Sequence, residues 1–130
     1  MIRVSQTHAL AFLLAAAVLP GIVQAQDTRP EDAKEYVNRG KAWIEKKEYD
    51  KAIKDFNEAI RLDPKDASAY FERGYAWSEK KEYDKAIIDF SEAIRLDPKD
   101  ALPFQNRAYA WIWKKEYDKA IDDYSKGIQL

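Results

Sequence analysis

The sequence contains no cysteine and only one histidine, His8, among its 130 residues. The absence of cysteine excludes a disulfide framework and any metal site that depends on thiolates. Beyond residue 8 the chain also lacks the imidazole that most often serves as a general base or activates a nucleophile. Its few serines therefore have no such partner, and no glycine-rich phosphate loop occurs. We expect no enzymatic activity and no cofactor or metal.

Long apolar runs are also scarce, since the only one extends from Ala9 to Leu19. This run falls well short of the roughly 20 apolar residues that a membrane-spanning helix needs. Arg3 precedes the run, Pro20 and Gly21 interrupt any helix after it, and the small residues up to Ala25 suit a signal peptidase. We predict that residues 1–25 are a cleaved secretory signal, that no membrane span remains after cleavage, and that the protein is periplasmic or secreted. An uncleaved membrane anchor is the alternative.

Neither sign of charge dominates the chain. Once Arg3 is removed with the signal, 21 of the 22 basic residues remain against 23 acidic residues. A nucleic-acid-binding domain normally carries a clear excess of clustered basic residues. We therefore expect no nucleic-acid partner.

One phrase occurs three times, in residues 45–53, 79–87 and 113–121, and its shared part reads Lys-Lys-Glu-Tyr-Asp-Lys-Ala-Ile. Each copy begins 34 residues after the previous one, a period that is typical of helical solenoids. No segment shows the alternating pattern of a strand. We predict a short lead-in over 26–32 and three repeats over 33–66, 67–100 and 101–130, the last incomplete and without a capping helix.

Each repeat is predicted to contain two helices. A proline ends each preceding unit because it cannot continue a helix, and an aspartate two residues later suits the N-cap position. The predicted first helices span 33–46, 67–80 and 101–114, with Asp32, Asp66 and Asp100 as N-caps. The predicted second helices span 50–62, 84–96 and 118–130, with Asp50, Asp84 and Asp118 as N-caps.

The first two repeats carry the same residue types at the same spacing. These residues are Tyr36, Gly40, Trp43, Ala52, Phe56, Ala59 and Pro64, followed by Tyr70, Gly74, Trp77, Ala86, Phe90, Ala93 and Pro98. The pattern closely resembles that of the tetratricopeptide repeat (TPR) family, and the resemblance covers Ala33 to Leu130. It implies an all-α fold, a right-handed α-solenoid of three antiparallel helix pairs.

Arginine replaces the leucine that the family usually has before the glycine, at Arg39, Arg73 and Arg107. These side chains are expected to pair either with nearby acidic groups such as Glu35 or with the neighbouring repeat, and the sequence leaves both alternatives open. The other acidic residues, including the adjacent pair at 122–123, are expected on helix exteriors, where they do not converge on a site.

In TPR proteins the first helices line a concave face, which binds extended peptides or a partner helix. Helical spacing assigns to that face one stripe from each first helix, at positions i, i+3, i+7 and i+10. Ser68, Ser78, Leu102 and Gln105 belong to this stripe. The predicted partner-binding residues are Lys34, Val37, Lys41, Ile44, Phe71, Tyr75, Tyr109, Ile112 and Trp113.

The predicted signal and the resemblance together imply an exported scaffold or adaptor that binds a protein or peptide in its concave groove. One TPR subclass clamps the C-terminal carboxylate of chaperones with lysine and asparagine. Val37, Glu72 and Leu102 stand where that clamp would need polar or basic groups, which argues against this ligand. The alternative for the aromatic wall is that its rings pack on one another or are covered by a helix that folds back.

The third repeat has Ala108, Tyr124 and Gly127 where the first two have Gly, Phe and Ala. No capping helix follows it in the sequence, so an open apolar edge is expected around Trp111, Ile121, Tyr124 and Ile128. Two alternatives follow for this edge. Either it mediates self-association, for instance as a homodimer, or the chain is the N-terminal part of a longer TPR-containing protein.

Overall fold

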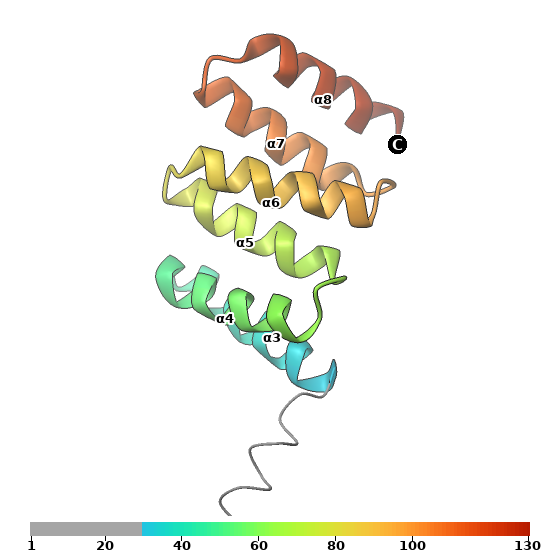
Figure 1. The fold of residues 1–130 in the computed structure, drawn as a ribbon. Helices are drawn as coiled ribbons and strands as arrows, with labels where there is room; N and C mark the ends of the chain where they lie inside the picture. The colour runs from blue at the N-terminus through green and yellow to red at the C-terminus, as the bar shows by residue number, and fades with distance from the viewer. Residues whose placement is uncertain (1–29) are drawn as a thin grey trace, which may run out of the picture.

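The computed structural model describes residues 30–130, drawn in colour in Figure 1. The predicted signal and most of the predicted lead-in lie outside the described residues. The elements are six helices: α3 (Pro30–Glu45), α4 (Tyr49–Leu62), α5 (Ala67–Glu79), α6 (Tyr83–Leu96), α7 (Ala101–Trp113) and α8 (Tyr117–Gln129). The described part of the chain contains no strand. The predicted helices are confirmed, with ends that differ by a few residues.

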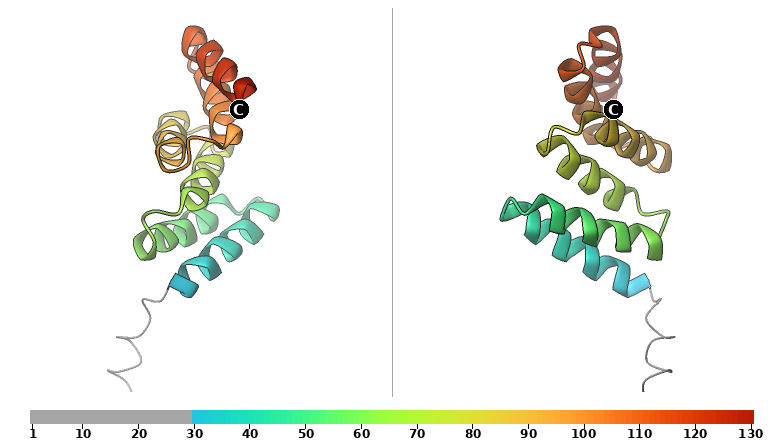
Figure 2. Two further views of the ribbon diagram at one scale, coloured as in Figure 1. Left: turned by 90° about the vertical axis from the view of Figure 1, so that its right-hand side faces the viewer. Right: turned by 60° about the vertical axis from the view of Figure 1, so that its left-hand side comes forward.

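Consecutive helices pair as antiparallel hairpins, and the three hairpins stack in chain order from α3/α4 to α7/α8 (Figure 1). The two views of Figure 2 show that successive hairpins are turned relative to one another, so the stack is not flat. Each first helix also packs against the second helix of the preceding hairpin, α5 on α4 and α7 on α6. The prediction of an all-α solenoid of three antiparallel helix pairs is confirmed.

The recurring segment of residues 45–53, 79–87 and 113–121 contains the turn inside each hairpin. Lys47 has a φ of 57°, and its equivalents Lys81 and Lys115 have φ values of 63° and 62°. This left-handed residue lets Glu48 N donate to Trp43 O at 2.9 Å and Lys47 N donate to Ile44 O at 2.8 Å. These two bonds form a Schellman motif, which satisfies carbonyl groups at the end of a helix. The repeated Lys-Lys-Glu segment therefore ends each first helix and reverses the chain.

The helix N-caps agree with the sequence at only two of the six predicted positions. Asp66 accepts a bond from Ser68 N at 2.9 Å, and Asp100 accepts one from Leu102 N at 3.0 Å. Asp32 is not a cap, because α3 already begins at Pro30. The predictions for the second helices are also wrong. Their N-caps are Glu48, Glu82 and Glu116, none of which makes a side-chain capping bond, and Asp50, Asp84 and Asp118 lie in the first turn.

In the first two hairpins, a phenylalanine ring packs directly over a glycine in the core. Phe56 and Phe90 are fully buried, and a Cβ atom built on Gly40 or Gly74 would lie 2.5 or 2.8 Å from the facing ring. Such contacts are too short for carbon atoms, so the close approach of the two helices requires glycine at these positions. In the third repeat Ala108 occupies the glycine position, and the facing Tyr124 is 37% exposed.

Gly127 has no such requirement, and Gly127→Ala is expected to raise the free energy of unfolding by about 0.5–1 kcal/mol. Its added Cβ would lie 3.4 Å from the Gln105 side chain, which is ordinary contact, and glycine within a helix is costly. Gly74→Ala should instead lower the free energy of unfolding by about 1–2 kcal/mol, because the added Cβ collides with Phe90. Urea unfolding followed by circular dichroism measures both changes. Shifts of the same sign would contradict this account.

Candidate functional site

Each of the three arginines that replace the family's usual leucine binds an aspartate of its own hairpin. In the first repeat Arg39 Nε donates to Asp55 Oδ2 at 2.7 Å, and Arg39 Nη2 donates to Asp55 Oδ1 at 2.6 Å. The same two-bond geometry recurs at Arg73–Asp89 and Arg107–Asp123 with distances of 2.7–2.8 Å. The aspartate lies sixteen residues after the arginine each time. The partner is therefore neither Glu35 nor any other residue of the first helix.

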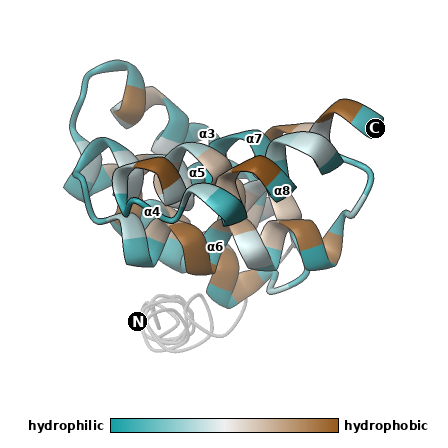
Figure 3. Cartoon of the chain, turned by 90° about the horizontal axis from the view of Figure 1, so that it is seen from above, coloured by the Kyte–Doolittle hydropathy of each residue, from teal (hydrophilic) through white to brown (hydrophobic). Residues whose placement is uncertain are grey.

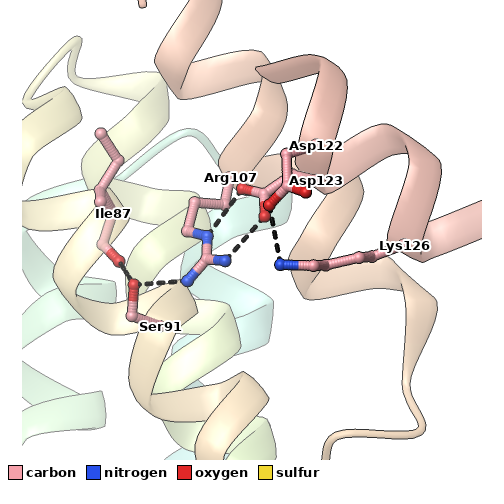
Figure 4. Close-up of polar contacts among 6 residues, drawn as sticks. All are labelled: Ile87, Ser91, Arg107, Asp122, Asp123 and Lys126. Atoms are coloured by element: carbon pink, nitrogen blue, oxygen red, sulfur yellow. Dashed lines mark hydrogen bonds and ion pairs between the residues drawn. The ribbon is translucent and has the colours of Figure 1, made fainter. Parts of the chain in front are cut away.

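Two of these guanidinium groups also reach the preceding repeat, so pairing with the neighbouring repeat, the second alternative, holds as well. Arg73 Nη1 donates to Asn57 Oδ1 at 2.8 Å, and Arg107 Nη1 donates to Ser91 Oγ at 2.8 Å. Figure 4 shows the second of these bonds together with the pair that Arg107 makes with Asp123. We call these three arginine–aspartate pairs the arginine ladder. Each pair links the two helices of its hairpin, and the second and third arginines also bind the preceding hairpin.

The aspartates of this ladder are buried, which corrects the expectation that the pair at 122–123 lies on a helix exterior. Asp122 is exposed and binds Lys126 Nζ at 2.7 Å, whereas Asp123 is buried on Arg107 (Figure 4). Burial raises the pKa of the Asp89 carboxyl, and the bonds from Arg73 offset part of that rise. The bond to Asp55 raises the pKa of Arg39 in turn. The arginine ladder is thus a structural element, because its arginines and aspartates bind one another.

Several of the aromatic residues that meet solvent gather where the first helices end. The Trp113 ring stacks on Tyr83, with centroids 5.9 Å apart and an interplanar angle of 2°. Tyr109 meets the same indole edge-on at 6.1 Å. One repeat earlier, Tyr49 Oη donates to Glu79 Oε2 at 3.1 Å. We call Tyr49, Tyr75, Glu79, Tyr83, Tyr109 and Trp113 the aromatic row.

The row remains accessible although its rings contact one another. Trp113 is 57% exposed and Tyr109 is 48% exposed, while Tyr75 is half-buried. Burial, together with the negative charge of Glu79, raises the pKa of Tyr75 above its ordinary value. The phenol therefore remains neutral and able to donate a hydrogen bond at neutral pH. The row offers flat aromatic surface with hydrogen-bonding groups at its margin.

The predicted binding residues do not all reach this surface. The prediction that Val37 binds a ligand is wrong, because this side chain is buried in the core beside Phe56. Ile44 packs partly against the same core. The ring of Phe71 lies 5.8 Å from that of Phe90, so it is shared between core and groove. Lys41 is exposed and pairs with Glu72 at 3.2 Å, which links α3 to α5.

The remaining residues of the predicted stripe are open to solvent in the first and third repeats. Lys34 is exposed on α3, and α7 exposes a continuous line of side chains at Leu102, Gln105, Tyr109, Ile112 and Trp113. A hollow of about 280 Å³ lies between α5 and α7, and Ser68, Phe71 and Leu102 are among the residues that line it. The stripe is thus most accessible on α7.

The sequence patterns did not single out Tyr49, Glu79 and Tyr83, because these residues lie in the recurring segment, outside the stripe that helical spacing assigns to the concave face. A comparison of the residues that face each other across each junction between repeats could have found them. The tyrosine recurs in every copy, while the residue opposite it, thirty positions later, changes from Glu79 to Trp113. A constant group that faces a changing one marks a variable surface.

Two family models match the chain. The model described as TPR repeat covers residues 40–80, and the model described as tetratricopeptide repeat covers residues 67–100. The chain belongs to the tetratricopeptide repeat family. No curated protein matches this TPR chain in sequence.

Solved TPR domains share this fold. The TPR domain of OM64 from Arabidopsis has a TM-score of 0.77 and 26% identity, over 78% of this chain and 84% of its own. The Sgt2 TPR domain from Aspergillus fumigatus has a TM-score of 0.73 and 28% identity, over 75% and 65%. The TPR2B domain of yeast Sti1, solved in complex with pHsp70, has a TM-score of 0.72 and 30% identity, over 73% and 76%.

Two further features are absent from residues 30–130. No three His, Asp or Glu side chains of that part converge as metal ligands. No helix in it is long and apolar enough to cross a membrane.

Proposed function

We propose that this TPR array is an exported scaffold that binds an extended segment of a partner protein along α7 and the end of α5. The observation that carries the proposal is the exposed pair Tyr109 and Trp113, held by the stacked ring of Tyr83. Buried aromatic anchors dominate many protein interfaces, and side chains that are already ordered lose less entropy on binding. The segment would place apolar side chains against this surface.

The margins of the groove favour a partner segment of mixed polarity. Glu79 lies beside the aromatic side chains, Lys34 lies at the α3 end, and Lys41 and Glu72 pair with each other between them. A ligand with basic groups toward α5 and acidic groups toward α3 would complement them. The complex of the yeast Sti1 domain supports a protein-derived ligand for this fold. A chaperone carboxylate is disfavoured, because Val37 is buried and Leu102 is apolar.

The test is Tyr109→Ala combined with Trp113→Ala, measured against peptides selected from a random library on the unaltered protein. Loss of both anchors should weaken binding at least tenfold, which corresponds to about 1.4 kcal/mol. The full chain should be expressed and the protein recovered from the periplasm. Its intact mass should correspond to residues 26–130 if the proposed export and cleavage occur.

Ile88→Ala is the matched control, because Ile88 is exposed on α6 and takes no part in the aromatic row. Both variants should keep the helicity of the unaltered protein. Equal peptide affinity in the double variant would exclude the aromatic row as the binding site. A mass that retains Met1 would refute export with cleavage and leave the binding result intact.

A further inference from the structure

The outer face of α8 repeats a surface that is covered elsewhere in the stack. Ile53 and Ile87 are 6% and 9% exposed, whereas the equivalent Ile121 is 64% exposed. Phe56 and Phe90 are fully buried, but Tyr124 at the same position is not, and Ile128 is 82% exposed. Figure 3 looks down on this end of the stack, where hydrophobic brown alternates with teal. Within residues 30–130, no helix packs on the outer side of α8.

Each internal junction between repeats is marked by three cross-repeat contacts. At the first junction Tyr49 bonds to Glu79, Asp50 pairs with Lys80, and Asn57 accepts from Arg73. At the second junction the corresponding pairs are Tyr83–Trp113, Asp84–Lys114 and Ser91–Arg107. The second helix supplies the first member of every pair, and the next first helix supplies the other.

The two ends of the stack carry the two halves of a third such junction. On α8 the equivalent residues are Tyr117, Asp118 and Ser125. Their counterparts are Arg39 and Glu45 on α3 and Lys46 directly after it. Lys46 lies over the Trp43 ring at 5.1 Å, much as Lys80 lies over Trp77 at 5.6 Å. The residues at the α8 end therefore offer partners of the right type to those at the α3 end, as at the internal junctions.

Side chains of α3 are more exposed than the equivalent side chains of α5 and α7. The Arg39 side chain is 55% exposed, whereas those of Arg73 and Arg107 are 21% and 19% exposed. Ala42 is exposed, although its equivalents Ala76 and Ala110 are fully buried. Both differences arise because Arg73 and Arg107 lie on helices that pack against a preceding repeat.

We propose that α8 of one copy of this chain binds α3 of a second copy, head to tail, with Asp118 facing Lys46 and Ser125 facing Arg39. Because two different surfaces meet, every added copy presents a new α8 face, so assembly does not stop at a dimer. Glu35 stands where the internal junctions bury Ala69 and Pro103, and burying an unpaired carboxylate is costly. The joint should therefore be weaker than an internal junction and depend on concentration.

Sedimentation velocity on the protein purified from cells that express the full chain tests this proposal. The mean mass should rise continuously with concentration and pass that of two chains. Lys46→Glu and Asp118→Lys place like charges across the joint, and each should weaken association about tenfold. An equimolar mixture of the two variants should recover association, because each variant then offers the charge that the other lacks. Glu35→Ala should strengthen it.

Ile88→Glu is the control, since it places a charge on an exposed isoleucine that lies outside the joint. It should leave the mass distribution unchanged, whereas Ile121→Glu should give a monomer. A protein that stays monomeric at every concentration would overturn the proposal. So would a mass that levels off at two chains and does not respond to Lys46→Glu, because that result indicates symmetric contact between two α8 faces.

Discussion

Phe90→Ala is expected to lower the free energy of unfolding by about 4 kcal/mol, near the middle of the range for removing a buried phenylalanine. The ring is fully buried, faces Gly74 and lies 5.8 Å from the Phe71 ring. Its removal leaves a cavity in the central hairpin, against which both outer hairpins pack. Since each repeat of a solenoid is stabilised by its neighbours, the whole stack should lose stability.

Tyr124→Ala is the matched control, because Tyr124 occupies the same position in the third repeat and is partly exposed. It should cost about 1–2 kcal/mol, since less apolar area is lost from the interior. Chemical denaturation at low protein concentration measures both variants. Combining Gly74→Ala with Phe90→Ala gives a further test, because the glycine replacement should no longer cost stability once the facing ring is absent. Equal losses for Phe90→Ala and Tyr124→Ala would contradict the packing described above.

Arg73→Met is expected to lower the free energy of unfolding by about 3 kcal/mol, the lower end of the range for removing one member of a buried ion pair. The variant leaves the buried Asp89 carboxylate without the two bonds that Arg73 donates, and Asn57 also loses its donor. The lower figure applies because the Arg73 side chain is about one-fifth exposed. Arg95→Met is the control. Arg95 bonds Glu92 on the surface, and its loss should cost less than about 1 kcal/mol.

The stability of Arg73→Met should depend on pH in a defined direction. Burial already raises the pKa of Asp89 in the unaltered protein, and the bonds from Arg73 oppose that rise. Without Arg73 the folded-state pKa rises further above the unfolded value, so the folded state binds the proton more tightly. Stability should then increase as the pH falls through the folded-state pKa of Asp89. Denaturation at several pH values checks this, and a variant that loses stability throughout that interval would contradict it.

The helical architecture was predictable from the sequence because its signals are local and repeated. The 34-residue period, the prolines between units, and glycine opposite phenylalanine each report a contact that recurs at a constant spacing. Even so, local signals misled at the second helices. An aspartate beside a helix start is a common N-cap, yet Asp50 and Asp84 pair with lysines thirty residues away.

The binding surface was predictable only in part. Helical periodicity predicted a stripe through Tyr109 with Trp113 next to it, and both side chains are exposed because, within residues 30–130, no repeat packs beyond α8. The same periodicity misassigned Val37, because a residue at the boundary of two faces can turn toward either one. Sequence spacing alone does not show how far the helix rotates toward its partner, and in α3 it rotates far enough to bury Val37 beside Phe56.

By itself, the sequence determined that this chain is a stack of helix pairs, because a 34-residue repeat reports the same local packing three times over. Only the tertiary structure decided where the arginines bind, which rings remain open, and which faces of α3 and α8 have no helix packed on them within residues 30–130. Those features depend on pairs such as Arg73–Asp89 and Tyr83–Trp113, whose members lie sixteen and thirty residues apart and meet only when hairpins fold and stack. The angles at which the helices pack bring these pairs together, and a repeat period does not report those angles.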